Sequence, residues 1–284
     1  MDRLYLAHFG LERAPFSITP DPRFFFPGAG RGDLLRAIEY SVRNQEGIVV
    51  VTGEVGSGKT MLCRTLLDAL PPDLESIYLA NPSLRRREIT AALLRDLGGG
   101  QRPDPLDALQ QVLISRHMSG RRVMLVVDEA HVMPYESLEQ IRLLSNLETG
   151  RHKLLQIVLF GQPELDDVLL DHRMRALRDR VVERFMLRQL ERAAAADYLG
   201  YRMRVAGLAG DSPFGPAAVR EIWSAAGGLV RRINLLADKA LLSAFIRGHQ
   251  RVDRRDVERA RFELDGTPPP RAAVPPAEPV GVLA

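Results

Sequence analysis

The stretch Gly53-Glu54-Val55-Gly56-Ser57-Gly58-Lys59-Thr60 matches the phosphate-binding loop pattern G-x-x-x-x-G-K-[ST] at every specified position. A run of mostly β-branched residues, 48–52, precedes it and predicts a buried parallel strand. The segment that follows, 61–67, has the spacing of an amphipathic helix. Strand, glycine loop and helix together bring backbone N–H groups and a helix N-terminus to one point, where an anion binds. In this context the motif predicts a phosphate site rather than a glycine-rich turn that binds nothing.

The residues of this loop have distinct expected roles. Lys59 would place a compact positive charge between the β- and γ-phosphates of a nucleotide, and the Thr60 hydroxyl is a candidate Mg²⁺ ligand. The chain has 39 Lys and Arg residues but only three lysines, so a lysine kept at this position indicates a functional requirement. The candidate nucleotide-binding residues of this segment are Gly53, Glu54, Val55, Gly56, Ser57, Gly58, Lys59, Thr60 and Met61.

A second hydrophobic run, 123–127, ends in the acidic pair Asp128-Glu129. Carboxylates at the tip of a buried strand are costly unless a cation or a water uses them. Asp128 is therefore a candidate to hold Mg²⁺ through its water shell, and Glu129 a candidate to orient and polarise the water that attacks the γ-phosphate. One carboxylate here could cap a helix, but two after a buried run favour ATP hydrolysis. We expect ATP and Mg²⁺ as the substrate and the cofactor.

The composition is that of an ordinary globular protein, with 284 residues, 45% hydrophobic and 26% charged. The formal net charge of +3 does not argue for nucleic acid. A single cysteine, Cys63, excludes an internal disulfide and suits a reducing compartment. No apolar run reaches the roughly 18–20 residues of a membrane span, and the N-terminus lacks the apolar region of a signal peptide. We therefore expect a cytoplasmic protein.

Strand and helix patterns alternate through the first two thirds of the chain. Further strands are expected at 76–80, 154–160 and 181–187, and helices at 86–97, 105–118 and 135–147. Parallel strands with crossover helices imply a three-layer α/β fold with its ligand at the carboxyl ends of the strands. The pattern then becomes helical, at 191–206, 216–226, 229–247 and 254–264. These helices predict a small all-helical domain beside the sheet.

We accordingly divide the chain into four parts. Residues 1–46 form an N-terminal strap and first helix that belong to the ATPase domain, and 47–189 form the α/β core. Residues 190–265 form a helical lid domain, and the proline-rich segment 266–284 is a flexible tail. The strap is rich in proline and phenylalanine, which excludes a long helix there and suggests a segment packed over the edge of the core.

Several sequence motifs beyond the phosphate loop are recognisable. They are Tyr5, Phe9-Gly10-Leu11, Pro15-Phe16, Thr19-Pro20-Asp21-Pro22-Arg23-Phe24, Thr52-Gly53-Glu54-Val55-Gly56, 141–149, Gly161-Gln162-Pro163-Glu164-Leu165 and 227–234. With the helical lid, they resemble AAA+ ATPases, and within these the ExeA/GspA-type ATPases and their shorter relatives in pilus, exopolysaccharide and sortase-linked secretion loci. The resemblance extends from Tyr5 to Leu264. One departure is Val230, where the lid motif of the family usually has proline.

The resemblance implies further site residues. Gln162 would be the sensor of the γ-phosphate, although asparagine is commoner there and a residue at a strand end can instead cap the next helix. Arg231 matches the lid arginine that reaches the phosphates, with its neighbour Arg232 as the alternative. Arg178 and Arg180 lie where AAA+ proteins carry an arginine finger for the neighbouring subunit, although an arginine-rich segment can also be a solvated face. The resemblance further implies that the strap covers the adenine.

The spelling Asp128-Glu129-Ala130-His131 is also that of DEAH-box helicases. We find no second helicase core, and the helical lid begins too early to leave room for one. We therefore interpret the match of His131 to the DEAH-box motif as a coincidence.

The leading functional hypothesis, from the resemblance, is a cytoplasmic switch or motor for cell-envelope assembly or export. ExeA proteins proper add a membrane span and a peptidoglycan-binding domain after the lid, and we find neither in this chain. The expectation is therefore a short relative that self-associates and is recruited to a membrane-bound secretion or pilus-assembly partner, peripheral at the inner membrane.

Two other classes of function stay open. The first is a DNA-binding ATPase resembling the transposition regulators MuB and TniB, in which the arginines of 85–87 and 254–255 would contact phosphates. The chain lacks base-reading or aromatic-basic patterns, so nucleic acid is not favoured. The second is a nucleotide-dependent scaffold with negligible turnover, against which Glu129 argues.

Overall fold

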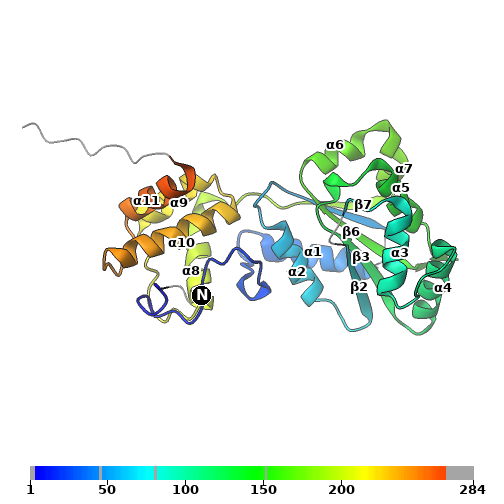
Figure 1. Ribbon diagram of the computed structural model, residues 1–284, viewed down its shortest axis with the longest axis horizontal. Helices are drawn as coiled ribbons and strands as arrows, with labels where there is room; N and C mark the ends of the chain where they lie inside the picture. Colours follow the sequence, from blue (N-terminus) through cyan, green and yellow to red (C-terminus); the bar gives the residue numbers. More distant parts are fainter. Residues whose placement is uncertain (1–3, 45–46, 80–81, 151, 267–284) are drawn as a thin grey trace, which may run out of the picture.

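The computed structural model describes residues 4–44, 47–79, 82–150 and 152–266. It has an α/β part at one end and a group of helices at the other (Figure 1). The expected strand end at Ala80 and the expected tail from residue 267 onward lie outside the described residues. No helix in the described ranges is both long enough and apolar enough to cross a membrane.

The α/β part is built on five parallel strands in the order β2-β3-β6-β1-β7. The strands are β1 (Ile48–Thr52), β2 (Leu74–Leu79), β3 (Arg122–Val127), β6 (Leu155–Gly161) and β7 (Val181–Met186). Because helices cover both faces of the sheet, the central strands β1 and β6 are buried along their whole length. The edge strand β7 is largely exposed. A short antiparallel hairpin of β4 (Glu148–Thr149) and β5 (His152–Lys153), which the sequence did not predict, precedes β6.

Helices cover both faces of this sheet, which makes the three layers. Val49 and Val51 of β1 pack in a cluster with α1 (Arg31–Asn44) and α2 (Lys59–Asp68), while Ile48 and Val50 point to the opposite face. That opposite face is covered by α3 (Arg86–Asp96), α4 (Pro105–Met118), α5 (Tyr135–Leu144), α6 (Glu164–Leu170) and α7 (Arg175–Arg178). The predicted three-layer α/β fold is confirmed.

The helical part comprises α8 (Ala195–Val205), α9 (Pro216–Ala226), α10 (Val230–Ile246) and α11 (Arg254–Asp265). Single turns of 3-10 helix lie at Pro22–Phe24, Ala130–Val132, His172–Met174 and Arg192–Ala194. The N-terminal strap contributes Tyr5, Phe9, Phe16 and Phe24 to the buried cluster of these helices. The strap therefore packs mainly into the helical part, whereas we expected it over the edge of the core.

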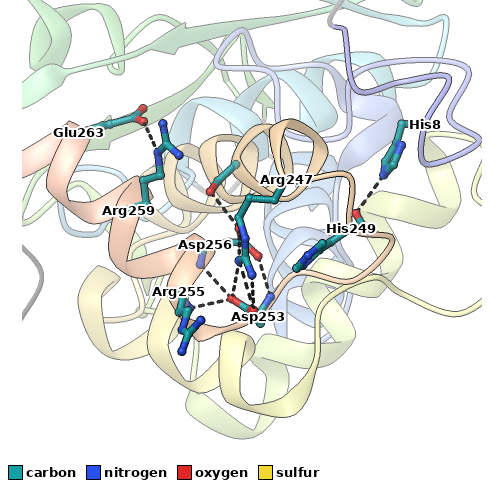
Figure 2. Close-up of polar contacts among 9 residues, drawn as sticks. His8, Arg247, His249, Asp253, Arg255, Asp256, Arg259 and Glu263 are labelled. Carbon is teal, nitrogen blue, oxygen red and sulfur yellow. Dashed lines mark hydrogen bonds and ion pairs between the residues drawn. The ribbon is translucent and has the colours of Figure 1, made fainter. Parts of the chain in front are cut away.

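The corner between α10 and α11 is held by buried polar contacts (Figure 2). Asp256 is fully buried and accepts hydrogen bonds from Ser243 Oγ (2.9 Å) and Arg247 Nη1 (3.0 Å). Asp253 caps α11 and also pairs with Arg247. On the same corner, His8 of the strap donates from Nε2 to the carbonyl of His249 at 2.9 Å. The strap is thus hydrogen-bonded to this corner of the helical part.

Candidate functional site

The phosphate loop lies between β1 and α2, at the carboxyl end of the central strands. Gly56 and Gly58 have φ of +78° and +105°, values that other residues rarely adopt, and Gly58 is the N-cap of α2. The N–H of Gly53 donates to the carbonyl of Gly161 at the end of β6 (3.2 Å). The sheet order thus brings the loop next to the tip of β6 and one strand away from the tip of β3.

Lys59 is the buried cation of the loop, with 5% of its surface exposed. Its Nζ donates to the carbonyls of Gly53 (2.8 Å) and Glu54 (3.1 Å), which leaves one of its three N–H donors free for a ligand. Burial lowers the pKa of Lys59, and the nearby Glu129 carboxylate counteracts this effect. The buried Ser57 Oγ has no hydrogen-bond partner among the described residues. A desolvated ammonium and an unused hydroxyl in a glycine loop fit the phosphates of a nucleotide.

Asp128, at the tip of β3, is 5% exposed. Its Oδ1 accepts from the N–H of Glu129 (2.9 Å) and its Oδ2 from the hydroxyl of Tyr78 on β2 (3.3 Å). Burial, with the Asp128 charge adding to it, raises the pKa of Tyr78 to about 12, so this phenol remains a donor. Sequence reasoning gave Tyr78 no role, because it was one apolar position of an expected strand.

A magnesium site at this point would draw on the Asp128 carboxylate and the Thr60 hydroxyl, both hard oxygen ligands. No group of three or more His, Cys, Asp or Glu side chains in the described ranges is arranged to hold a metal ion. Mg²⁺ commonly binds through one or two protein oxygens and completes its shell with water and phosphate oxygens. The residues present therefore fit a magnesium ion that arrives with a nucleotide.

Glu129 has a positive φ of +53°, a conformation that non-glycine residues seldom adopt and that clusters at functional sites. Its Oε2 lies 3.4 Å from Gln162 Nε2 and 3.4 Å from His131 Nδ1. The N–H of Gln162 also donates to His131 Nδ1 (3.4 Å). A ring nitrogen that accepts this hydrogen bond carries no hydrogen and cannot donate to Glu129. Gln162 Nε2 is then the donor to the Glu129 carboxylate. His131, interpreted as coincidental, thus belongs to this cluster.

The arginines proposed for the lid and for the finger lie in different surroundings. Arg231 borders the cavity beside the loop, whereas Arg232 donates to the carbonyl of Ala225 (2.8 Å) and pairs with Asp265 (2.5 Å). Arg178 is half-buried and Arg180 exposed, both away from the cavity. Neither has a side-chain hydrogen bond or ion pair within the described part of the chain. The structure brings Arg231 to the site and leaves Arg178 and Arg180 outside it.

A cavity of about 300 Å³ lies between the phosphate loop, the strap and α10. Its lining includes the loop residues Gly58, Lys59 and Thr60, together with Glu129. The lining also includes apolar and aromatic side chains, among them Phe24, Phe25, Met61, Tyr198 and Val230. Pockets for small molecules have this volume and this mixture of apolar walls with a few polar groups. The volume and chemistry fit a nucleotide, with its base against apolar side chains and its phosphates at the loop.

The buried Arg31 also lines this cavity, and sequence reasoning missed it. No local signal could have found it, because the chain is rich in arginine and Arg31 belongs to none of the motifs.

Comparisons with known proteins agree with this geometry. Residues 42–169 match a family model described as an AAA domain. This part of the chain is therefore similar to AAA domains. The chain is 38% identical over 269 residues to the General secretion pathway protein A of Aeromonas hydrophila. The match covers 93% of the chain but 49% of that relative, so the chain spans about half the length of the curated relative. The resemblance to the ExeA/GspA-type family is confirmed.

Solved structures share the fold of this chain. Cdc6p from Pyrobaculum aerophilum has a TM-score of 0.65 at 16% identity, covering 86% of this chain and 71% of that chain. The Aeropyrum pernix ORC1 protein, solved in complex with DNA, has a TM-score of 0.64 at 18% identity, covering 89% of this chain and 70% of that chain. At such identities the likeness concerns the fold alone.

Proposed function

We propose that this protein binds and hydrolyses ATP with Mg²⁺ and acts as a switch or motor for cell-envelope secretion, pilus or exopolysaccharide assembly. The observation that supports the pathway is the 38% identity to a general secretion pathway protein over 93% of the chain. Support for the chemistry comes from the cavity, because Lys59 and Glu129 both line it.

In this proposal each residue has one task. Lys59 and the loop amides hold the phosphates, and Thr60 and Asp128 hold Mg²⁺, which when bound neutralises charge on the transferring phosphoryl group. Glu129 orients the attacking water and accepts its proton. Gln162, which donates to Glu129, links that carboxylate to the occupancy of the phosphate site.

We further propose that residues 190–265 act as a lid over the core, because the first turn of α10 borders the cavity. Arg231 would contact the phosphates from this lid. Arg178 or Arg180 would complete the site of a neighbouring subunit, since both lie outside their own cavity. We place the protein in the cytoplasm, where a membrane-bound secretion or pilus-assembly partner would recruit it.

DNA binding is the less favoured alternative. Two of the arginines that it would use already have partners: Arg86 donates to Gln140 (2.8 Å) and Arg254 pairs with Glu258 (2.8 Å). A protein held by phosphate contacts should bind duplex DNA less tightly as salt rises, because counterions are released. Tight ATP-dependent DNA binding near physiological salt, or stimulation of turnover by DNA, would favour the transposition-type function.

Two measurements test the proposal. The purified chain should bind ATP and release phosphate only with Mg²⁺ present. In the source organism, deletion of the gene should impair export or pilus or polysaccharide assembly. The parent gene should restore it, and the Glu129→Gln variant should not. A deletion strain with normal envelope assembly would contradict the cellular role and leave the chemistry standing.

A further inference from the structure

Arg31 connects two segments that lie far apart in the sequence. It is the first residue of α1, only 7% exposed, and it lines the cavity. Its Nη1 donates to the carbonyl of Ser57 in the phosphate loop (2.9 Å). Its Nη2 donates to the carbonyl of Arg188, in the linker between β7 and the helical part (3.2 Å). One guanidinium therefore bridges the loop and the linker.

The charge of this guanidinium is not matched by the protein. Within the described residues Arg31 pairs with no carboxylate and stacks on no aromatic ring, and burial lowers its pKa. Arg202, at 3% exposure, is a useful contrast, because its guanidinium lies 4.9 Å from the centroid of the Phe24 ring and it donates to the hydroxyl of Tyr198 (3.1 Å). Aromatic faces compensate a buried cation. Arg31 lacks that compensation, and a buried unmatched cation costs free energy.

The position of Arg31 indicates what would match its charge. A methyl group built on Gly58 would lie 3.3 Å from Arg31 Nη1, so the guanidinium lies directly against the segment that opens α2. Lys59, the next residue, is another buried cation that lines the same cavity. A guanidinium has five N–H donors, and two carbonyl contacts leave others free. Two buried cations beside a glycine loop call for an anionic ligand.

We propose that Arg31 is a nucleotide-binding residue whose charge is neutralised by the phosphates held at loop 53–60. Through the carbonyl of Arg188, the same side chain ties the linker to the occupied loop. The proposal rests on ATP binding as proposed above. Without nucleotide the buried charge destabilises the folded protein. With nucleotide bound, the same charge strengthens nucleotide binding.

The test compares Arg31→Met with Arg36→Met, a matched change on the same helix. Arg36 is 71% exposed and pairs only with Asp33, so its variant should resemble the parent. Without nucleotide, Arg31→Met should melt close to the temperature of the parent, because removal of a buried unmatched charge offsets the loss of the hydrogen bonds to the carbonyls of Ser57 and Arg188. Calorimetry should show ATP binding weakened about tenfold or more, as expected for a lost charged contact. The loss should grow from AMP through ADP to ATP.

A second variant separates charge from geometry. Arg31→Lys keeps the positive charge but loses the planar set of guanidinium donors. If the charge is what binds the phosphates, this variant should retain ATP affinity within about threefold of the parent. Unchanged ATP affinity in Arg31→Met would overturn the proposal, and so would an equal loss for AMP and ATP, which would indicate a contact with the base. A melting temperature far below that of the parent, or failure to fold, would make Arg31 a structural bridge instead. If the parent itself bound no ATP, the proposed function would fail.

Discussion

The backbone N–H of Arg231 donates to the carbonyl of Gly56 at 3.0 Å. Arg231 is the second residue of α10, a position whose N–H has no acceptor within the helix. A carbonyl of the phosphate loop therefore accepts a hydrogen bond from an N–H group at the N-terminus of α10, in the proposed lid. Because of this bond, the geometry of the loop and the position of α10 depend on each other.

Gly56→Ala should disturb this contact. Gly56 has φ +78°, and an added Cβ would lie 3.1 Å from the Cβ of Arg231. The backbone strain alone should lower the stability of the protein by about 1–2 kcal/mol. The disturbed contact with α10 should in addition weaken ATP binding. Gly210→Ala is the matched control, since nothing lies within 4 Å of its added Cβ. Calorimetric titration of ATP should separate the two variants, and equal affinities would contradict the role of the contact.

Lys59→Met and Glu129→Gln should have different defects. Loss of the Lys59 charge should cripple ATP binding, because we propose that its Nζ binds the phosphates in the ground state. Glu129→Gln should bind ATP but lose most of its turnover, because an amide cannot take a proton from the attacking water. Binding and single-turnover assays measure the two effects separately. Undiminished hydrolysis by Glu129→Gln would remove Glu129 from the mechanism.

Catalysis should depend on assembly if Arg178 or Arg180 acts on a neighbouring subunit. Turnover per subunit should then rise with protein concentration. A variant with the finger arginine replaced should bind ATP yet hydrolyse it slowly. Mixing it with Glu129→Gln should restore some activity, because one type of interface combines an intact carboxylate with an intact arginine. Concentration-independent turnover with no recovery on mixing would indicate a monomeric switch.

Cys63 should react with thiol reagents only after unfolding. It is fully buried on α2, and burial, with the Asp128 charge adding to it, raises its thiol pKa above the usual range. The reactive thiolate is therefore scarce at pH 8 in the folded protein. Labelling by iodoacetamide should be slow in buffer, fast in denaturant, and slower still with ATP present. Rapid labelling of the folded protein would show that α2 opens readily.

Local signals placed several elements at their observed bounds. The expected helix at 105–118 is α4, which begins with Pro105 and is capped by Asp104 through the N–H groups of Leu106 and Asp107. The helix at 216–226 is α9, which ends at Gly227 with φ +59°. The hairpin of β4 and β5 was missed, because strands of two residues have no periodicity to detect.

The amino-acid sequence by itself determined the phosphate loop, the acidic strand end and the change from alternating to helical structure. Each of these depends on neighbouring residues, through strand period, helix caps and glycine conformation. Only the tertiary structure decided the strand order, which places Gln162 beside Glu129. Tertiary packing also decided that Arg31 and Arg231, rather than Arg232, border the cavity. In a chain rich in arginine these residues look alike, because the burial and partners that distinguish them come from segments distant in the sequence.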